Sequence, residues 1–248
     1  MNQKHNREAF VIIFISSFLF LTFQIIISSF LRAYLKLPFL SITFAFLGLS
    51  LAGLFVFYKY PEISKENALK KIPLFLNGFG GMMLLIFYVV FIFSMNKQLD
   101  LYSFLSNTSD LTPLEFATSY LRTLFGLSIF NGLFFSVCFF LLGVVYSLLY
   151  KVVSDQTPRL YFFDLLGAGL GCVAGVLFLN IIPFNAIPAL LAVIAFMSAF
   201  YLNIVYRQPA IKRNLNLLLL FIGGIFFLIV ALYENNPHFS HKAEMWSK

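Results

Sequence analysis

Charged residues are scarce in this sequence. Only 11% of the residues are Asp, Glu, Lys or Arg, whereas soluble domains carry about 25%. Hydrophobic residues make up 60% of the chain, and 34 residues are Phe. A globule with so few charges has too few polar groups to cover its surface in water. The composition therefore excludes an ordinary soluble domain and indicates a protein whose solvent is lipid.

Histidine and cysteine are also rare, which limits the cofactors that the chain can hold. The three histidines all lie outside the long apolar runs: His5, His238 and His241. A membrane b-type haem protein needs axial His ligands within its helices, so this class is excluded. The C-terminal histidine pair, with Glu244, favours a solvated terminus over a weak metal site.

Cys138 and Cys172 lie inside apolar runs and are predicted to be free thiols. We expect no metal and no cofactor.

The sequence has neither a basic face nor a catalytic constellation. The net charge is +7, but the Lys and Arg residues occur in ones, twos and threes between apolar runs. No face is basic enough to follow a phosphate backbone, so nucleic acid is not an expected partner. No nucleophile–base group is visible either. We therefore predict no catalytic residue within these 248 residues, and whether the chain serves an enzyme stays open.

Long hydrophobic runs are what the sequence has in abundance. Roughly 20 apolar residues cross ~30 Å of hydrocarbon as a helix, and these runs are too long and unbroken for barrel strands. We predict an all-α, polytopic transmembrane helical bundle of about seven spans, with an eighth possible. The predicted spans are Phe10–Phe30, Pro38–Tyr58, Ile72–Met95, Leu124–Tyr150, Leu160–Ile182, Ala186–Tyr206 and Leu215–Tyr233.

The segments between the runs complete the predicted layout. Residues 1–236 form the transmembrane domain, and residues 237–248 form a polar tail. The longest connection is Asn96–Thr123, in which Pro113 follows Thr112 as at a helix start. We expect a short interfacial helix to run from Pro113 into the fourth span. Residues 180–185 are predicted to be a tight turn around Pro183.

The distribution of basic residues predicts the orientation. With the N-terminus in the cytoplasm, eleven Lys and Arg residues lie inside and six lie outside. The inside set is Lys4, Arg7, Lys59, Lys65, Lys70, Lys71, Lys151, Arg159, Arg207, Lys212 and Arg213. We expect this topology in a bacterial inner (plasma) membrane.

The fifth predicted span is the most informative segment. Gly167, Gly171 and Gly175 recur every four residues and form a smooth face that another helix can approach closely. Asp164 shares this face, and it is the one acidic residue of the ten that falls within a predicted span. The three glycines are predicted to be helix-packing residues.

Two interpretations of Asp164 remain open. Acids within membrane spans tend to be functional, which favours a ligand or cation contact or a proton relay. Alternatively, Asp164 follows Arg159 by five residues and lies near the interface, where the helix dipole and a local hydrogen-bond donor stabilise it. The second interpretation is slightly favoured.

One segment carries a family resemblance. Residues 139–172, FFLLGVVYSLLYKVVSDQTPRLYFFDLLGAGLGC, resemble the membrane region of spermidine synthase-like proteins, and YFFDLLGAGLG is the closest part. Trp246-Ser247 also resembles the pair that opens the soluble aminopropyltransferase-type domain of that family. The resemblance implies that the tail is the start of a soluble domain, that the catalytic residues lie beyond it, and that a soluble synthase-like protein is a candidate partner.

Two functions follow as hypotheses. In the first, the chain is a membrane module of spermidine synthase-like type that anchors a partner, or binds or passes a small cationic metabolite. In the second, it is a non-catalytic structural subunit of a larger membrane complex, since Gly-rich helix faces also pack against partners. An ion-driven transporter is less favoured because no inverted repeat is visible.

Overall fold

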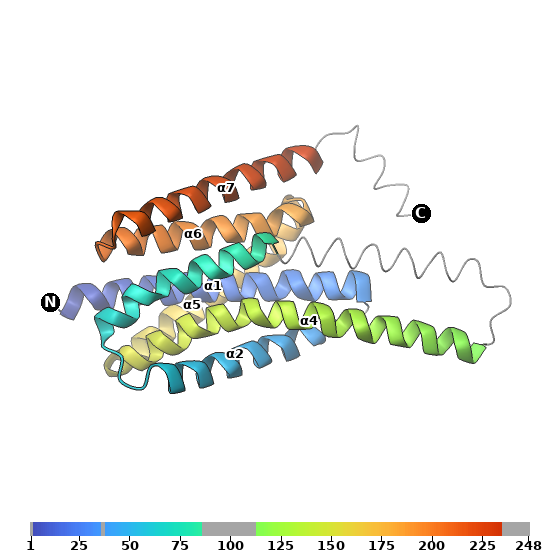
Figure 1. Ribbon diagram of the computed structural model, residues 1–248, viewed down its shortest axis with the longest axis horizontal. Coiled ribbons are helices and arrows are strands. Elements are labelled where there is room, and N and C mark those ends of the chain that lie inside the picture. The colour runs from blue at the N-terminus through green and yellow to red at the C-terminus, as the bar shows by residue number, and fades with distance from the viewer. Residues whose placement is uncertain (1, 36–37, 86–112, 235–248) are drawn as a thin grey trace.

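The computed structural model describes residues 2–35, 38–85 and 113–234, and within these ranges every long element is a helix and none is a strand (Figure 1). This confirms the predicted all-α fold class. Six helices in the described part are long and apolar enough to cross a membrane. The chain is therefore a membrane-spanning protein. The polar tail predicted for residues 237–248 lies outside the described residues.

The long helices alternate in direction along the chain, so that consecutive ones run antiparallel (Figure 1). Their bounds are α1 Asn2–Leu35, α2 Leu40–Lys59, an unlabelled helix at residues 65–85, α4 Pro113–Val152, α5 Thr157–Ile181, α6 Ile187–Val205 and α7 Ala210–Glu234. Two short 3₁₀ helices, η1 Ser154–Gln156 and η2 Phe184–Ala186, precede α5 and α6. The third predicted span, Ile72–Met95, is described only to residue 85.

Several helices begin earlier than the apolar runs predict. The connection expected at Lys59–Lys71 ends at residue 64, because the backbone N–H of Ala68 already donates to the Ser64 carbonyl at 2.9 Å. The helix start predicted at Pro113 is confirmed, because α4 begins at this residue and continues unbroken for 40 residues into the fourth span. At about 1.5 Å per residue, such a helix is roughly 60 Å long and exceeds the hydrocarbon thickness. Its first part therefore extends past the neighbouring helices (Figure 1).

The turn expected around Pro183 is present. Ile182 ends α5 in an extended conformation, and Pro183 continues with φ −52° and ψ 133° into η2. The Ile182 N–H donates to the Phe178 carbonyl at 2.9 Å, and the Ala186 N–H donates to the Pro183 carbonyl at 2.9 Å. The turn thus reverses the chain while its backbone donors stay paired.

Helix α1 forms the centre of the bundle and contacts α2, α4, α5 and α6. Its Phe23 is fully buried, and its ring lies 5.7 Å from the ring of Phe79 and 5.1 Å from that of Phe139. Edge-on and tilted aromatic pairs at these distances add to the packing energy. A cluster of phenylalanine rings thus holds α1 to the helix of residues 65–85 and to α4.

Small residues allow α2 and α4 to approach closely. A Cβ atom on Gly48 would lie 2.6 Å from the Ser136 carbonyl oxygen, and one on Gly143 would lie 2.8 Å from the Ala52 Cβ. In lipid, helix association depends on such close packing because the hydrophobic effect is absent between helices. This interface comes from small residues that the sequence interpretation did not single out.

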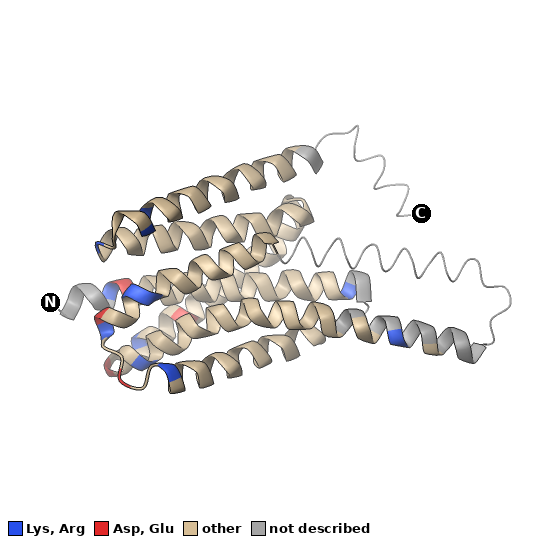
Figure 2. Ribbon diagram, viewed as in Figure 1, with Lys and Arg blue, Asp and Glu red and all other residues tan. Residues whose placement is uncertain are grey.

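Most of the described charged residues lie at one end of the bundle, where α1 begins (Figure 2). The basic residues at this end are Arg7, Lys59, Lys65, Lys70, Lys71, Lys151, Arg159, Arg207, Lys212 and Arg213. At the opposite end the described part has Arg32 and Arg122. We refer to the first as the basic end.

Candidate polar site at Asp164

Asp164 joins three helices near the basic end. Its carboxylate is half-buried in the second turn of α5, and each oxygen accepts a hydrogen bond from a hydroxyl group of another helix. Ser17 of α1 lies 2.5 Å from Oδ1, and the Tyr150 hydroxyl of α4 donates to Oδ2 at 2.7 Å. Ser17 Oγ also lies 2.6 Å from the Ile13 carbonyl. Since a serine has one hydroxyl hydrogen, it satisfies only one of these two acceptors at a time.

The glycines of α5 bring this helix close enough to α1 to form the site. A Cβ atom on Gly167 would lie 2.2 Å from the Phe14 carbonyl oxygen, and one on Gly171 would lie 2.6 Å from that of Phe18. Thr22 of α1 also donates to the Gly171 carbonyl at 3.0 Å. The backbones therefore touch on either side of Ser17, and this contact sets the distance between Ser17 and Asp164.

Gly175 continues the same interface one turn further along α5. A Cβ atom there would lie 3.0 Å from the Ile25 side chain. All three predicted packing glycines are buried on the side of α5 that faces α1. Their partner is thus a helix of the same chain.

Asp164 has hydroxyl partners but no cationic partner among the residues that the structure describes. Two hydroxyl donors leave some of the lone pairs of a carboxylate unoccupied. Such a group can accept a further hydrogen bond from an ammonium group. No group of three or more His, Cys, Asp or Glu residues in the described ranges could hold a metal ion.

The residues that complete the site were not identified from the sequence. Ser17 is one of many small residues in the first span, and nothing in its position marks it. The sequence gives a weak indication for Tyr150. Tyr146 precedes it by four residues, so the two tyrosines lie on one face of the helix. That face turns toward α5 only in the folded bundle.

The position of Glu8 differs from the prediction. The apolar runs predict that Glu8 and eight other acids lie outside the spans, but α1 begins at Asn2 and the candidate span begins at Arg7. Glu8 is only 4% exposed, and the Tyr206 hydroxyl donates to its Oε2 at 2.6 Å. The apolar run starts later than the helix, so sequence hydropathy alone did not include this buried acid.

A second polar contact crosses the bundle in the membrane region. Asn77 on the helix of residues 65–85 donates from Nδ2 to Oδ1 of Asn216 on α7. Asn216 is 1% exposed, and among the described residues neither its Nδ2 nor Oδ1 of Asn77 has a hydrogen-bond partner. A single interhelical bond between amides is the common use of Asn in membrane helices. It holds α7 to a neighbouring helix.

No protein-family model, curated protein or solved structure matches this chain. The resemblance of residues 139–172 to spermidine synthase-like proteins therefore stays a prediction.

Proposed function

We propose that the chain is an integral membrane module that binds a small cationic metabolite, an amine of polyamine type, at Asp164. The observation that carries the proposal is the carboxylate itself: it lies within a candidate span and pairs with two hydroxyls and with no cation in the described part. Ionisable groups within membranes are costly, so one retained without a counter-ion is a candidate for ligand contact.

The arrangement of partners fits this role. Ser17 and Tyr150 hold the carboxylate from two different helices, so the group is oriented before any ligand arrives. Tyr150 Oη is also an acceptor and provides a second oxygen for an ammonium group. The resemblance to spermidine synthase-like proteins favours an amine as the ligand.

The alternative, a structural subunit, draws less support from the same residues. It was motivated by the glycine face of α5, but Gly167, Gly171 and Gly175 all pack against α1 of the same chain. That face is therefore occupied and is not free for a partner protein.

Binding of radiolabelled spermidine to the full chain in lipid nanodiscs tests the proposal. Asp164→Asn keeps the size of the side chain and its ability to accept a hydrogen bond, but removes the charge. We expect an affinity loss of about tenfold or more, corresponding to the loss of one close charge pair of ~1.4 kcal/mol.

Asp155→Asn is the matched control, because Asp155 is exposed in η1 at the same end of the bundle. It should bind spermidine as the wild type does. Equal affinities for the wild type and for a folded Asp164→Asn variant would reject the proposal and leave the carboxylate as a structural group. Size-exclusion chromatography and circular dichroism establish that the variant is folded.

We also propose that the basic end faces the cytoplasm of a bacterial inner membrane. The enrichment of Lys and Arg at the end where α1 begins supports this orientation through the positive-inside rule (Figure 2). A ligand at Asp164 would then reach its site from the cytoplasmic interface.

A further inference from the structure

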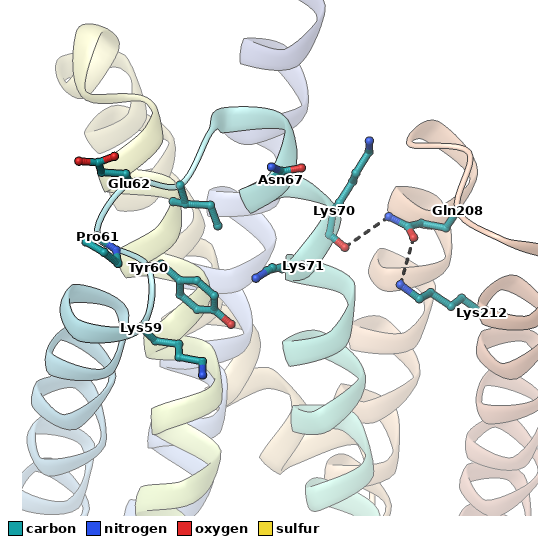
Figure 3. A pocket seen from close by; sticks show the side chains of 10 residues that line it. Lys59, Tyr60, Pro61, Glu62, Asn67, Lys70, Lys71, Gln208 and Lys212 are labelled. Atoms are coloured by element: carbon teal, nitrogen blue, oxygen red, sulfur yellow. Dashed lines mark hydrogen bonds between the residues drawn. The ribbon is translucent and has the colours of Figure 1, made fainter.

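A cavity opens at the basic end, separate from the residues that hold Asp164. It has a volume of about 520 Å³, which is within the usual range of ligand pockets. Lys59 at the end of α2 and the connection that follows it form one side. Gln208, in the connection before α7, and Lys212, in the first turn of α7, form the other (Figure 3). The cavity thus lies where two connections meet at the end of the membrane helices.

The lining carries an excess of positive charge. Four lysines and one glutamate line the cavity. Figure 3 shows that the Glu62 carboxylate points away from Lys71 and Lys212. Lys70 is neutralised by Glu66, whose carboxylate lies 2.5 Å from the ammonium group. The ammonium groups of Lys59, Lys71 and Lys212 therefore remain without a carboxylate partner among the described residues.

Neutral groups hold two of these lysines in place. The Lys71 ammonium group lies over the Tyr60 ring, 4.2 Å from its centroid, and Lys212 donates to Oε1 of Gln208 at 3.2 Å. Gln208 in turn donates to the Lys70 carbonyl at 3.5 Å. An aromatic ring and an amide position a cation without cancelling its charge.

The floor of the cavity is fixed to the bundle. Lys151, at the end of α4, donates to the Tyr60 carbonyl at 2.7 Å, so the chain entering the 59–63 segment is tied to a third helix. The lysines are thus presented from the end of α2 and from the first two turns of the helices that follow the two connections. This differs from a row of solvated lysines on one helix face.

We propose that this cavity binds a phosphate group, with Lys71 and Lys212 as its principal contacts and Lys59 at its rim. Basic pockets between membrane helices at the interface accept phosphorylated headgroups, which present several oxygens to ammonium donors. The phosphate belongs either to an anionic lipid headgroup or to a soluble phosphate compound. The site is distinct from Asp164, since it selects the opposite charge.

Native mass spectrometry of the purified full chain in mild detergent tests this site. Phosphatidic acid, with an exposed phosphomonoester, is titrated against phosphatidylcholine as the zwitterionic reference. We expect phosphatidic acid to bind more tightly. Lys71→Gln combined with Lys212→Gln should weaken its binding by about 25-fold, or roughly fivefold for each lysine near the surface.

The matched control is Arg159→Gln combined with Arg213→Gln. Both arginines are exposed at the same end and neither lines the cavity. This variant carries the same change in net charge and should keep the wild-type affinity for phosphatidic acid. Equal losses in the two double variants would overturn the proposal, because they would show diffuse attraction. Equal binding of phosphatidic acid and phosphatidylcholine to the wild type would also overturn it.

Competition distinguishes the two sources of phosphate. If millimolar inorganic phosphate displaces phosphatidic acid from the wild type, the cavity recognises the phosphate alone and a soluble ligand is supported. If phosphatidic acid stays bound while the double lysine variant releases it, the lipid headgroup is supported. Either result upholds a phosphate site at Lys71 and Lys212.

Discussion

At the scale of single residues, two acids inside this bundle, the half-buried Asp164 and the buried Glu8, accept hydrogen bonds from hydroxyl groups. Asp164 accepts bonds from Ser17 and Tyr150, and Glu8 accepts one from Tyr206. A hydroxyl group that donates to a carboxylate stabilises it through a charge-assisted hydrogen bond. The two pairs also join α1 to α4, α5 and the end of α6.

The Glu8–Tyr206 pair predicts a dependence of stability on alkaline pH. Burial, and then the hydrogen bond to Glu8 and its negative charge, raise the pKa of the Tyr206 phenol above its usual range. An unfolded tyrosine loses its proton near pH ~10. The folded chain keeps this proton to higher pH, so the stabilising contribution is complete below pH ~10 and falls as the pH rises further.

Tyr206→Phe should therefore flatten the loss of stability above pH ~10, by at most about 1.4 kcal/mol per pH unit relative to the wild type. Unfolding in a detergent mixture, followed by circular dichroism between neutral and alkaline pH, measures the difference. Tyr58→Phe removes a hydroxyl from a side chain that is 77% exposed and should keep the wild-type profile. Parallel profiles for the wild type and Tyr206→Phe would contradict the expectation.

At the scale of helices, the glycines of α5 determine how closely it lies against α1. Gly167 and Gly169 are two residues apart, yet a Cβ atom would meet the Phe14 backbone at the first position and nothing within 4 Å at the second. The chain therefore provides a matched pair for testing the interface.

Gly167→Ala should destabilise the bundle by about 1–3 kcal/mol, because backbone atoms have to move apart to admit the methyl group. Gly169→Ala should be neutral or slightly stabilising, since alanine is the better helix former. Reversible unfolding in mixed micelles gives both values. The first variant should also weaken spermidine binding, because it separates Ser17 from Asp164. Equal stabilities for the two variants would show that the close contact is not required.

At the scale of the whole molecule, the alternating helices bring basic segments that are distant in sequence to one end (Figure 2). Lys59, Lys151 and Lys212 lie on three different helices and meet there only because each connection reverses the chain. This end carries the lysine-lined cavity, and Asp164 lies near it in the second turn of α5.

Labelling of single cysteines tests the orientation of this end. In a background without Cys138 and Cys172, Ser154→Cys places a thiol at the basic end and Asn180→Cys places one at the opposite end; both positions are exposed. With a membrane-impermeant maleimide added to intact bacterial cells, we expect Asn180→Cys to react and Ser154→Cys to react only after lysis. The reverse pattern would place the basic end outside.

Parts of the fold could be read from residue patterns because lipid imposes simple rules. The apolar runs predicted helices, since no other arrangement of unbroken runs satisfies the backbone in hydrocarbon. The turn at Pro183 was also predictable from a local preference. The helix ends were less predictable. The first helix, α1, and the helix of residues 65–85 begin in polar segments, where hydropathy does not indicate where a helix starts.

The candidate site was predicted only in part. Asp164 stood out because an acid is rare within an apolar run, but its partners Ser17 and Tyr150 are ordinary residues in their own segments. Likewise, no sequence pattern marks Gly48 and Gly143 as packing residues, although they allow α2 and α4 to approach closely. Side chains of different helices become partners through the relative rotation of those helices, which depends on packing over the whole bundle.

The sequence by itself determined the solvent, the helical class and the excess of basic residues, because each of these follows from composition and from runs along one segment. Only the tertiary structure decided that the glycine face of α5 packs against α1, that Glu8 is buried against Tyr206, and that lysines from three helices line one cavity. The physical reason is that hydropathy acts on each residue separately, whereas contact between helices depends on the shapes of both surfaces together.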